Sequence, residues 1–261
     1  MVLSYSFCNV SVIPVRLEPA HKAEQVTQLL FGERAEVLEL NDKDWARIRC
    51  EWDGYEGWCK IGQLNMVSRK EYKKTPRYMA EGHTAKLVFD KGQLMLPLGS
   101  ELIALKKSGI NTGSQTGIYK GKKLNRKNLT VDSISVKNAA MQYLHAPYQW
   151  GGRSIAGIDC SGLTQMAFKL CGKSIMRDAS QQATEGELVD FLQYARCGDL
   201  AFFNNDDGKI VHTGILLDNA TIIHATDTSG RVVIDPIDQA GIISATLKKR
   251  THHLRFVKRF F

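Results

Sequence analysis

The chain has 261 residues, of which 43% are hydrophobic and 24% are charged, and its formal net charge is +8. This length exceeds the roughly 100 to 200 residues of one domain, so we expect two or three compact units. The composition excludes a disordered or collagen-like chain. The basic residues are scattered, which argues against a nucleic-acid partner and leaves attraction to carboxylate-rich ligands.

The cysteines and the N-terminal stretch narrow the class of protein further. The six cysteines form no C-x-x-C pair, so neither a zinc ribbon nor a thioredoxin-type site is predicted, and we expect free thiols. The opening MVLSYSFCNVSVIPVR has no basic segment and no long apolar run, and no stretch of about 18 apolar residues occurs elsewhere. We therefore expect a cytoplasmic monomer. We also expect that it needs no cofactor and binds no membrane.

Residues 1–67 show the pattern of a small β-rich domain. Short runs alternate apolar and polar residues from Cys8 to Val67, and Gly32, Asn41-Asp42 and Asp53-Gly54 break them. This pattern predicts short strands joined by tight turns. With its elements G-E-x-x-x-V and D-G-Y-x-G-W, the segment resembles a bacterial SH3-like (SH3b) domain, and we predict a first small barrel here.

A second β-rich stretch follows the charged linker at residues 68–76. Residues 75–129 repeat the turn-then-strand rhythm in GQLMLPLGSELIAL, and they hold no catalytic pair of their own. No D-G-x-x-G-W element recurs, so rhythm and position alone support the prediction of a second SH3b-like barrel.

At Asp132 the spacing of the apolar residues changes to that of a helix face. This change marks a third domain, residues 130–261. Asp132 or Ser133 is a helix N-cap candidate ahead of apolar residues at helical spacing, and a second helix is expected from about Cys160 to a stop at Gly172. Four strand-like runs follow, at residues 199–203, 210–217, 221–226 and 232–234. Helices followed by an antiparallel sheet predict an α+β domain.

Cys160 is the candidate nucleophile. In GGRSIAGIDCSGLTQMAFKL it lies where a glycine-rich loop becomes a helix, so that unpaired backbone N–H groups point towards its side chain. A helix N-terminus with a neighbouring imidazolium lowers the pKa of a cysteine from ~8.5 to ~3.5–7.5. We therefore expect a thiolate at Cys160, whereas Cys171 and Cys197 are interpreted as buried apolar residues.

His212 is the candidate base and His224 the group that orients it. His212 in GKIVHTGILL lies on a predicted strand, with Val211 and Thr213 on the opposite face. His224 follows on the next predicted antiparallel strand, where it can accept the second N–H of the base. Two alternatives remain. His212 is a water-bonded histidine of an edge strand, or Cys160, His212 and His224 form a zinc site. No fourth ligand at short spacing is seen, so we expect no metal.

The order of motifs in the third domain resembles the NlpC-type (NlpC/P60) cysteine peptidases of bacterial cell walls. These motifs are Y-x-W-G-G, D-C-S-G-L, G-D-L-x-F-F, H-x-G-I and a second histidine. The resemblance implies a papain-like catalytic core preceded by two small SH3b-like barrels. It also implies that Cys160, His212 and His224 are nucleophile, base and orienting residue.

The barrels ahead of this domain narrow the resemblance to γ-D-glutamyl-L-diamino acid endopeptidases, which act on murein peptides with a free N-terminal L-Ala. That resemblance implies a murein peptide as partner, with Tyr55 of the first barrel closing one end of the cleft. It also implies further substrate contacts in the catalytic domain, namely Tyr148, Asp159, Ser161, Asp178 and Ser180. Met176 stands where the family pattern has proline before R-D, so the register at Ser180 is not fixed.

Physical arguments support some of these contacts and leave alternatives for others. A carboxylate at Asp178 can bind the ammonium group of a peptide, and Tyr148 with the Cys160 backbone N–H can stabilise an oxyanion. Alternatively, Asp159 and Asp178 only cap the helices that follow them, and Tyr55 is only a turn aromatic. Two other functions stay open: a general peptidoglycan endopeptidase or amidase, and a wall-binding protein with an inactive catalytic fold.

Overall fold

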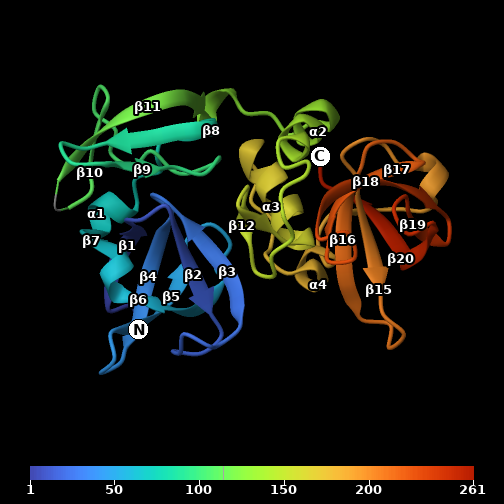
Figure 1. Ribbon diagram of the computed structural model, residues 1–261, viewed down its shortest axis with the longest axis horizontal. Helices are drawn as coiled ribbons and strands as arrows, with labels where there is room; N and C mark the ends of the chain where they lie inside the picture. The colour runs from blue at the N-terminus through green and yellow to red at the C-terminus, as the bar shows by residue number, and fades with distance from the viewer. Residues whose placement is uncertain (114) are drawn as a thin grey trace. The chain divides into compact units, whose positions relative to one another are not determined.

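The computed structural model describes residues 1–113 and 115–261, which divide into two compact units (Figure 1). The first unit is Met1–Leu129 together with the tripeptide Arg153–Ile155, and the second is Thr130–Gly152 with Ala156–Phe261. No helix among the described residues combines the length and the apolar character needed to cross a membrane.

The N-terminal part of the first unit is an antiparallel sheet of seven strands in the order β3-β2-β6-β5-β4-β1-β7. The strands are β1 (Ser4–Cys8), β2 (Val12–Arg16), β3 (Gln25–Leu30), β4 (Arg34–Leu40), β5 (Trp45–Cys50), β6 (Glu56–Lys60) and β7 (Leu64–Val67). Gly32 and Gly54 take φ of 77° and 72° in the turns before β4 and β6, a backbone conformation that favours glycine. The predicted short strands and tight turns are confirmed.

A four-stranded antiparallel sheet in the order β10-β11-β8-β9 completes the first unit. Its strands are β8 (Tyr78–Val88), β9 (Gln93–Met95), β10 (Gly109–Asn111) and β11 (Thr116–Asn125), and the short helix α1 (Arg69–Tyr72) precedes them. Phe7 of the first sheet and Phe31 of its β3–β4 turn pack with Ala80 and Leu87 of the second, so the two sheets share a core. The identity of residues 75–129 as an SH3b-like barrel stays a prediction.

Three helices lead the second unit within the described residues: α2 (Ser133–Met141), α3 (Cys160–Leu170) and α4 (Ala179–Gln182). Asp132 caps α2 by accepting a hydrogen bond from the Ser135 amide at 2.9 Å, as its N-cap position predicts. Helix α3 packs against α2 and β16 (Ile210–Leu216), and all its residues are buried. Its burial is therefore wider than the single apolar face that the helical spacing predicts.

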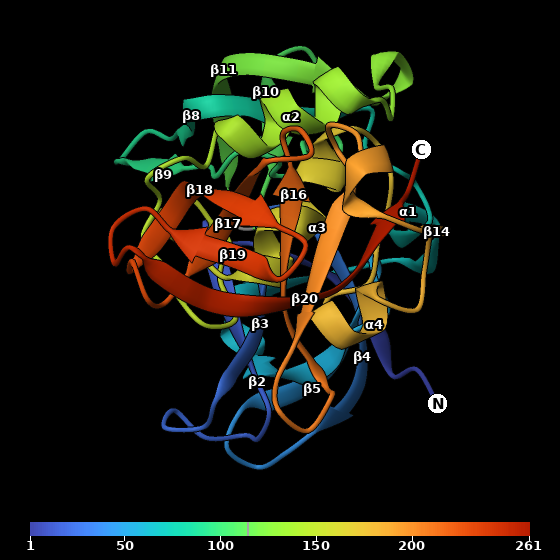
Figure 2. The same cartoon turned by 90° about the vertical axis from the view of Figure 1, so that its right-hand side faces the viewer.

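The strands of the second unit close into a barrel. The sheet order is β14-β20-β15-β16-β17-β18-β19, and β19 also pairs with β20, so that six strands form a ring (Figure 2). Besides β16, they are β14 (Glu187–Val189), β15 (Leu200–Asn204), β17 (Thr221–Thr226), β18 (Arg231–Asp238), β19 (Gly241–Ser244) and β20 (Lys249–Arg259). Helices precede the sheet, which is the predicted α+β order, but β19 and β20 were not predicted.

The remaining short elements are the two-residue strands β12 (Arg153–Ser154) and β13 (Gly157–Ile158) and the 3-10 turns η1 (Ile61–Gln63), η2 (Arg126–Asn128) and η3 (Leu192–Tyr194).

Candidate active site

The loop before Cys160 is held against the first turn of α3. A Cβ added to Gly162 would lie 2.2 Å from the carbonyl oxygen of Gly152, so only glycine allows this approach. Asp159 caps the helix: its Oδ1 accepts a hydrogen bond from the Gly162 amide and its Oδ2 accepts one from the Gly151 amide, both at 2.7 Å. Cys160 is therefore fixed as the first residue of α3, as predicted.

Asp159 and Ser161 both form hydrogen bonds with another side chain of the protein, that of Arg177. The buried guanidinium of Arg177, 1% exposed, forms an ion pair with Asp159 Oδ2 at 2.7 Å and donates to Ser161 Oγ at 2.7 Å. The alternative that Asp159 is a helix cap is confirmed, whereas substrate contacts by Asp159 and Ser161 stay predictions. The sequence patterns did not single out Arg177, because a buried arginine is recognisable only once its carboxylate partner is placed.

Burial dominates the ionisation of Cys160. It raises the pKa of the Cys160 thiol to about 12, and the charge of Asp159 adds to the rise. Backbone hydrogen bonds with Thr213 and Ser161 and the charge of Arg177 lower this pKa, but by less. The expected resting thiolate is therefore wrong, because the helix N-terminus is outweighed by desolvation of the sulfur and by a neighbouring carboxylate.

The structure brings His212 and His224 into hydrogen-bond contact. His212 on β16 is 7% exposed whereas Val211 is 50% exposed, as the strand alternation predicts. His212 Nε2 lies 2.9 Å from His224 Nδ1, and the rings meet edge to face. Gly214 makes room for this contact, because a Cβ at that position would lie 2.9 Å from the Cβ of His224. The glycine of the H-x-G motif thus has a steric explanation.

Two further side chains complete the histidine cluster. His224 Nε2 lies 3.2 Å from Oδ2 of Asp235 on β18, and the His252 ring on β20 stacks on His212 with centroids 4.0 Å apart. Neither residue was predicted. The predicted strand at residues 232–234 ended before Pro236, yet β18 continues through it. His252 belongs to the unpredicted β20, whose alternation was obscured by basic residues.

Burial keeps His212 and His252 neutral near pH 7. Desolvation, followed by the charges that His252 and His224 would carry, lowers the pKa of His212 well below 6.5. Burial and His224 lower the pKa of His252 to about 4, although Asp227 and Asp235 oppose this shift. A neutral imidazole can act as a base, so His212 is available to accept a proton.

The structure groups three histidines, a different set from the Cys160, His212 and His224 of the zinc alternative, and their residue type but not their ring orientation suits a metal ion. Ring nitrogens of His212, His224 and His252 lie within 4.8 Å of one another, as a metal cluster would require. However, the planes of His212 and His252 are only 26° apart, and His212 Nε2 faces His224 Nδ1. Lone pairs of stacked rings run side by side and do not converge on one tetrahedral ion. The arrangement favours a hydrogen-bonded relay.

Tyr148 presents a protonated hydroxyl close to the nucleophile. Burial, with the charges of Cys160 and Asp159, raises the pKa of Tyr148. Within residues 1–113 and 115–261 we find no hydrogen-bond partner for its hydroxyl, and the side chain is half-buried. This hydroxyl can act as a donor, and its contact with an oxyanion stays a prediction.

The other predicted substrate contacts lie outside this cluster. Asp178 is half-buried and caps α4 in a capping box with Gln181, which confirms the capping alternative, and Ser180 is exposed on α4. Tyr55 lies in the first unit, in the turn between β5 and β6, where its carbonyl accepts from the Cys50 amide at 2.9 Å. Substrate contacts by these three residues stay predictions.

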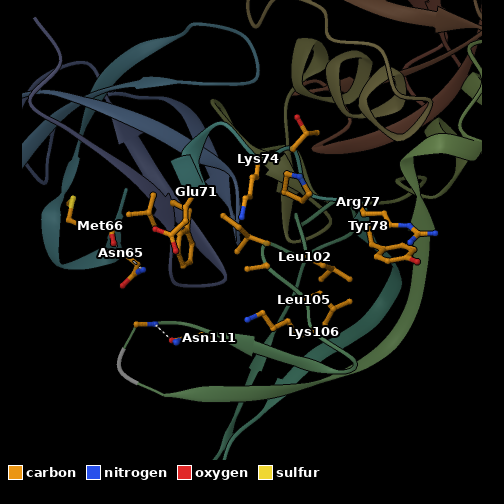
Figure 3. A pocket seen from close by; sticks show the side chains of 17 residues that line it. Asn65, Met66, Glu71, Lys74, Arg77, Tyr78, Leu102, Leu105, Lys106 and Asn111 are labelled. Atoms are coloured by element: carbon orange, nitrogen blue, oxygen red, sulfur yellow. Dashed lines mark hydrogen bonds between the residues drawn. The ribbon is translucent and has the colours of Figure 1, made fainter. Parts of the chain in front are cut away.

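A cavity of about 560 Å³ in the first unit has different chemistry (Figure 3). Lys74, Arg77 and Lys106 contribute positive charge to a lining that also contains the apolar Leu102 and Leu105. Neither cysteine nor histidine is among its lining residues. The cavity therefore offers no nucleophile with a base, and the candidate chemistry belongs to the second unit.

Comparison with known families agrees with this geometry. Residues 145–251, which contain Cys160, His212 and His224, match the model of the NlpC/P60 family. These residues of the second unit therefore form an NlpC/P60 domain. Residues 15–64 match the model described as a bacterial dipeptidyl-peptidase Sh3 domain. The chain therefore carries an NlpC/P60 catalytic domain preceded by an SH3 domain.

Curated relatives and solved structures cover most of the chain. It is 27% identical over 251 residues to dipeptidyl-peptidase 6 of Lysinibacillus sphaericus, covering 85% of this chain and 88% of the relative. It is 29% identical over 224 residues to γ-D-glutamyl-L-lysine dipeptidyl-peptidase of Bacillus subtilis, covering 80% and 74%. A crystal structure of an NlpC/P60 protein from Bacillus cereus shares the fold, with a TM-score of 0.81, 20% identity and coverage of 98% and 99%.

Proposed function

We propose that this NlpC/P60 enzyme is a cysteine endopeptidase that hydrolyses the γ-D-glutamyl–L-diamino acid bond of peptidoglycan-derived peptides carrying a free N-terminal L-Ala. The observation that carries the peptidase assignment is the contact of His212 with His224, together with a cysteine at a helix N-terminus that is hydrogen-bonded to the backbone of Thr213, the chain neighbour of His212. The names of the Bacillus subtilis and Lysinibacillus sphaericus relatives support the choice of bond.

The mechanism begins with a neutral thiol and a neutral imidazole. His212 Nε2 is engaged with His224, so Nδ1 is the ring nitrogen left to take the proton from Cys160 Sγ. As that proton moves, the sulfur attacks the γ-carbonyl carbon of D-Glu and a tetrahedral oxyanion forms. The Tyr148 hydroxyl and the Cys160 backbone N–H stabilise this oxyanion.

Collapse of the intermediate breaks the C–N bond. The proton on His212 passes to the leaving amine of the diamino acid, and a thioester to Cys160 remains. His212 then removes a proton from water, the hydroxide attacks the thioester, and the thiol recovers its proton as L-Ala-γ-D-Glu departs. Asp178 binds the ammonium group of L-Ala, which sets the position of the scissile bond.

Product analysis tests this function. We expect L-Ala-γ-D-Glu-L-Lys and its diaminopimelate counterpart to yield L-Ala-γ-D-Glu and the free diamino acid. Acetylation of the L-Ala amine removes its charged contact with Asp178, which costs about 2–5 kcal/mol, or roughly 30-fold to several thousand-fold in kcat/KM. Asp178→Asn should reduce this preference, whereas Asp190→Asn, at an exposed carboxylate of the same unit, should leave it unchanged.

The alternatives predict other results. Equal cleavage of free and acetylated peptides would identify a general peptidoglycan endopeptidase, and release of L-Ala from a muramyl group would identify an amidase. Tyr55→Ala tests the contribution of the first unit: if Tyr55 encloses the L-Ala amine, the preference for free peptides falls with little change for acetylated ones.

We also propose that residues 75–129 are a second SH3b-like barrel, which the rhythm of their strands supports.

A further inference from the structure

The structure assigns a fourth member to the proton relay of this site. We propose that Asp235 is a positioning residue that fixes the tautomers of His224 and His212, so that His212 presents an unprotonated Nδ1 to Cys160. The inference rests on the proposed function only in taking His212 as the base. It concerns how that base is held, and neither the family comparison nor the sequence patterns assign a role to Asp235.

The sheet register places Asp235 beside His224. Asp235 pairs with Ile222 across β17 and β18, and His224 pairs with Val233, so Asp235 and His224 are diagonal neighbours. His224 is completely buried and Asp235 is 3% exposed. A carboxylate so enclosed needs hydrogen-bond donors at its oxygens.

Both oxygens of Asp235 have such donors. Oδ1 accepts from the Ala245 amide at 3.0 Å, and Oδ2 lies 3.2 Å from His224 Nε2. Burial raises the pKa of Asp235, but the bonds from His224 and from the Ala245 amide together lower it below its ordinary value. Asp235 is therefore ionised near neutral pH and accepts at both positions.

The tautomers then follow one from another. Because ionised Asp235 can only accept, Nε2 of His224 carries a proton, and Nδ1 of His224 is left to be the acceptor in the contact with His212. This Nδ1 accepts a hydrogen bond from the N–H at His212 Nε2, 2.9 Å away. The Nδ1 of neutral His212 is consequently unprotonated. When His212 takes the thiol proton, the same chain links the imidazolium to the carboxylate of Asp235.

Asp235→Asn is the informative substitution, since an amide has one oxygen and one NH₂ group. If the NH₂ faces His224 Nε2, both histidine tautomers reverse and His212 directs an N–H at the thiol. If it faces the Ala245 amide, two buried donors oppose each other and the fold loses stability. The equivalent exchange in serine peptidases lowers kcat about 10⁴-fold through the wrong tautomer.

We expect Asp235→Asn to lower kcat by about 10²-fold or more with little change in KM, and to slow alkylation of Cys160 by iodoacetamide by about tenfold or more. Alkylation requires no peptide, so this result stands whichever bond the enzyme cleaves. Asp238→Asn is the matched control: it lies on the same strand, exposed and paired with Arg250, and both rates should stay within about twofold of wild type.

Nitrogen-15 NMR of histidine-labelled wild-type protein tests the assignment without any variant. The proposal requires His212 and His224 to carry their protons on Nε2, with both Nδ1 atoms unprotonated. Asp235→Asn should reverse this pattern where the variant folds. A protonated Nδ1 on His224 in the wild type would overturn the proposal, as would Asp235→Asn with full kcat and full alkylation rate.

Discussion

At the scale of single residues, burial favours the neutral forms of both Cys160 and His212. Burial raises the pKa of Cys160 to about 12 and lowers that of His212 well below 6.5, so both groups are neutral near pH 7. A charged pair would place two ions in a desolvated site. In the proposed mechanism His212 is therefore a general base during attack and not a standing imidazolium.

This balance predicts the pH dependence. Neutral His212 is the active form, and its folded-state pKa is lowered, so kcat/KM should hold its value between pH 7.5 and about 6 and fall only at lower pH. Iodoacetamide alkylation of Cys160 should rise through the alkaline range, because the raised pKa leaves little thiolate at neutral pH. A full alkylation plateau already present at pH 6 would show a resting thiolate–imidazolium pair instead.

The lowered pKa of His212 also makes the free energy of unfolding depend on pH. An unfolded histidine takes up a proton near pH ~6.5, whereas folded His212 does so only at lower pH. The unfolded state therefore binds more protons below pH ~6.5, and the free energy of unfolding should decrease as the pH falls through that value.

At the scale of elements, the start of α3 carries the nucleophile and depends on Asp159. This carboxylate caps the helix and also neutralises the buried guanidinium of Arg177. Removing one member of a buried ion pair leaves the other charge uncompensated, which is more damaging than losing a cap alone.

We therefore predict that Asp159→Ala lowers the free energy of unfolding by about 3–5 kcal/mol, measured by urea denaturation. Asp132→Ala is the matched control, since Asp132 caps α2 in the same unit but is exposed and has no ion pair. Its effect should be much smaller. Equal effects of the two substitutions would contradict the structural role of the Asp159–Arg177 pair.

The sequence could predict those parts of the site that depend on local patterns. The loop-to-helix position of Cys160 and the alternation around His212 are local, and both were found. Asp235 and His252 could not be placed, because their positions depend on the register of β18 and on the closure of the barrel through β20. The ionisation of Cys160 was predicted wrongly, since burial is a property of the folded unit and not of the motif.

At the scale of the whole molecule, the two units do not correspond to two continuous segments. Arg153–Ile155 belongs to the first unit although the chain on both sides belongs to the second. There Arg153 forms a buried two-point ion pair with Glu33, with nitrogen–oxygen distances of 2.8 and 3.0 Å. Its backbone amide donates to Gln28 Oε1 at 2.8 Å. The first unit is therefore incomplete without residues from beyond Leu129.

Glu33→Ala tests how much the Glu33–Arg153 ion pair contributes to the free energy of unfolding. It leaves the Arg153 charge buried without its carboxylate, and we expect a loss of about 3–5 kcal/mol in the free energy of unfolding. Glu36→Ala, which removes a carboxylate paired with Arg49 at the surface of the same sheet, should cost much less because that pair is hydrated. Similar losses for both variants, measured by thermal or urea unfolding, would argue against the buried pair.

The most direct test asks whether Cys160 is the nucleophile. It compares the turnover and the intact-protein mass of Cys160→Ala with those of Cys171→Ala. Both cysteines lie on or beside α3 and both are buried, but only Cys160 adjoins the histidine relay. We predict that Cys160→Ala folds normally, shows no hydrolysis of L-Ala-γ-D-Glu-L-Lys and gains no acyl mass with substrate. Cys171→Ala should retain turnover. Hydrolysis by Cys160→Ala at a rate near that of the wild type would contradict the assignment of Cys160 as the nucleophile.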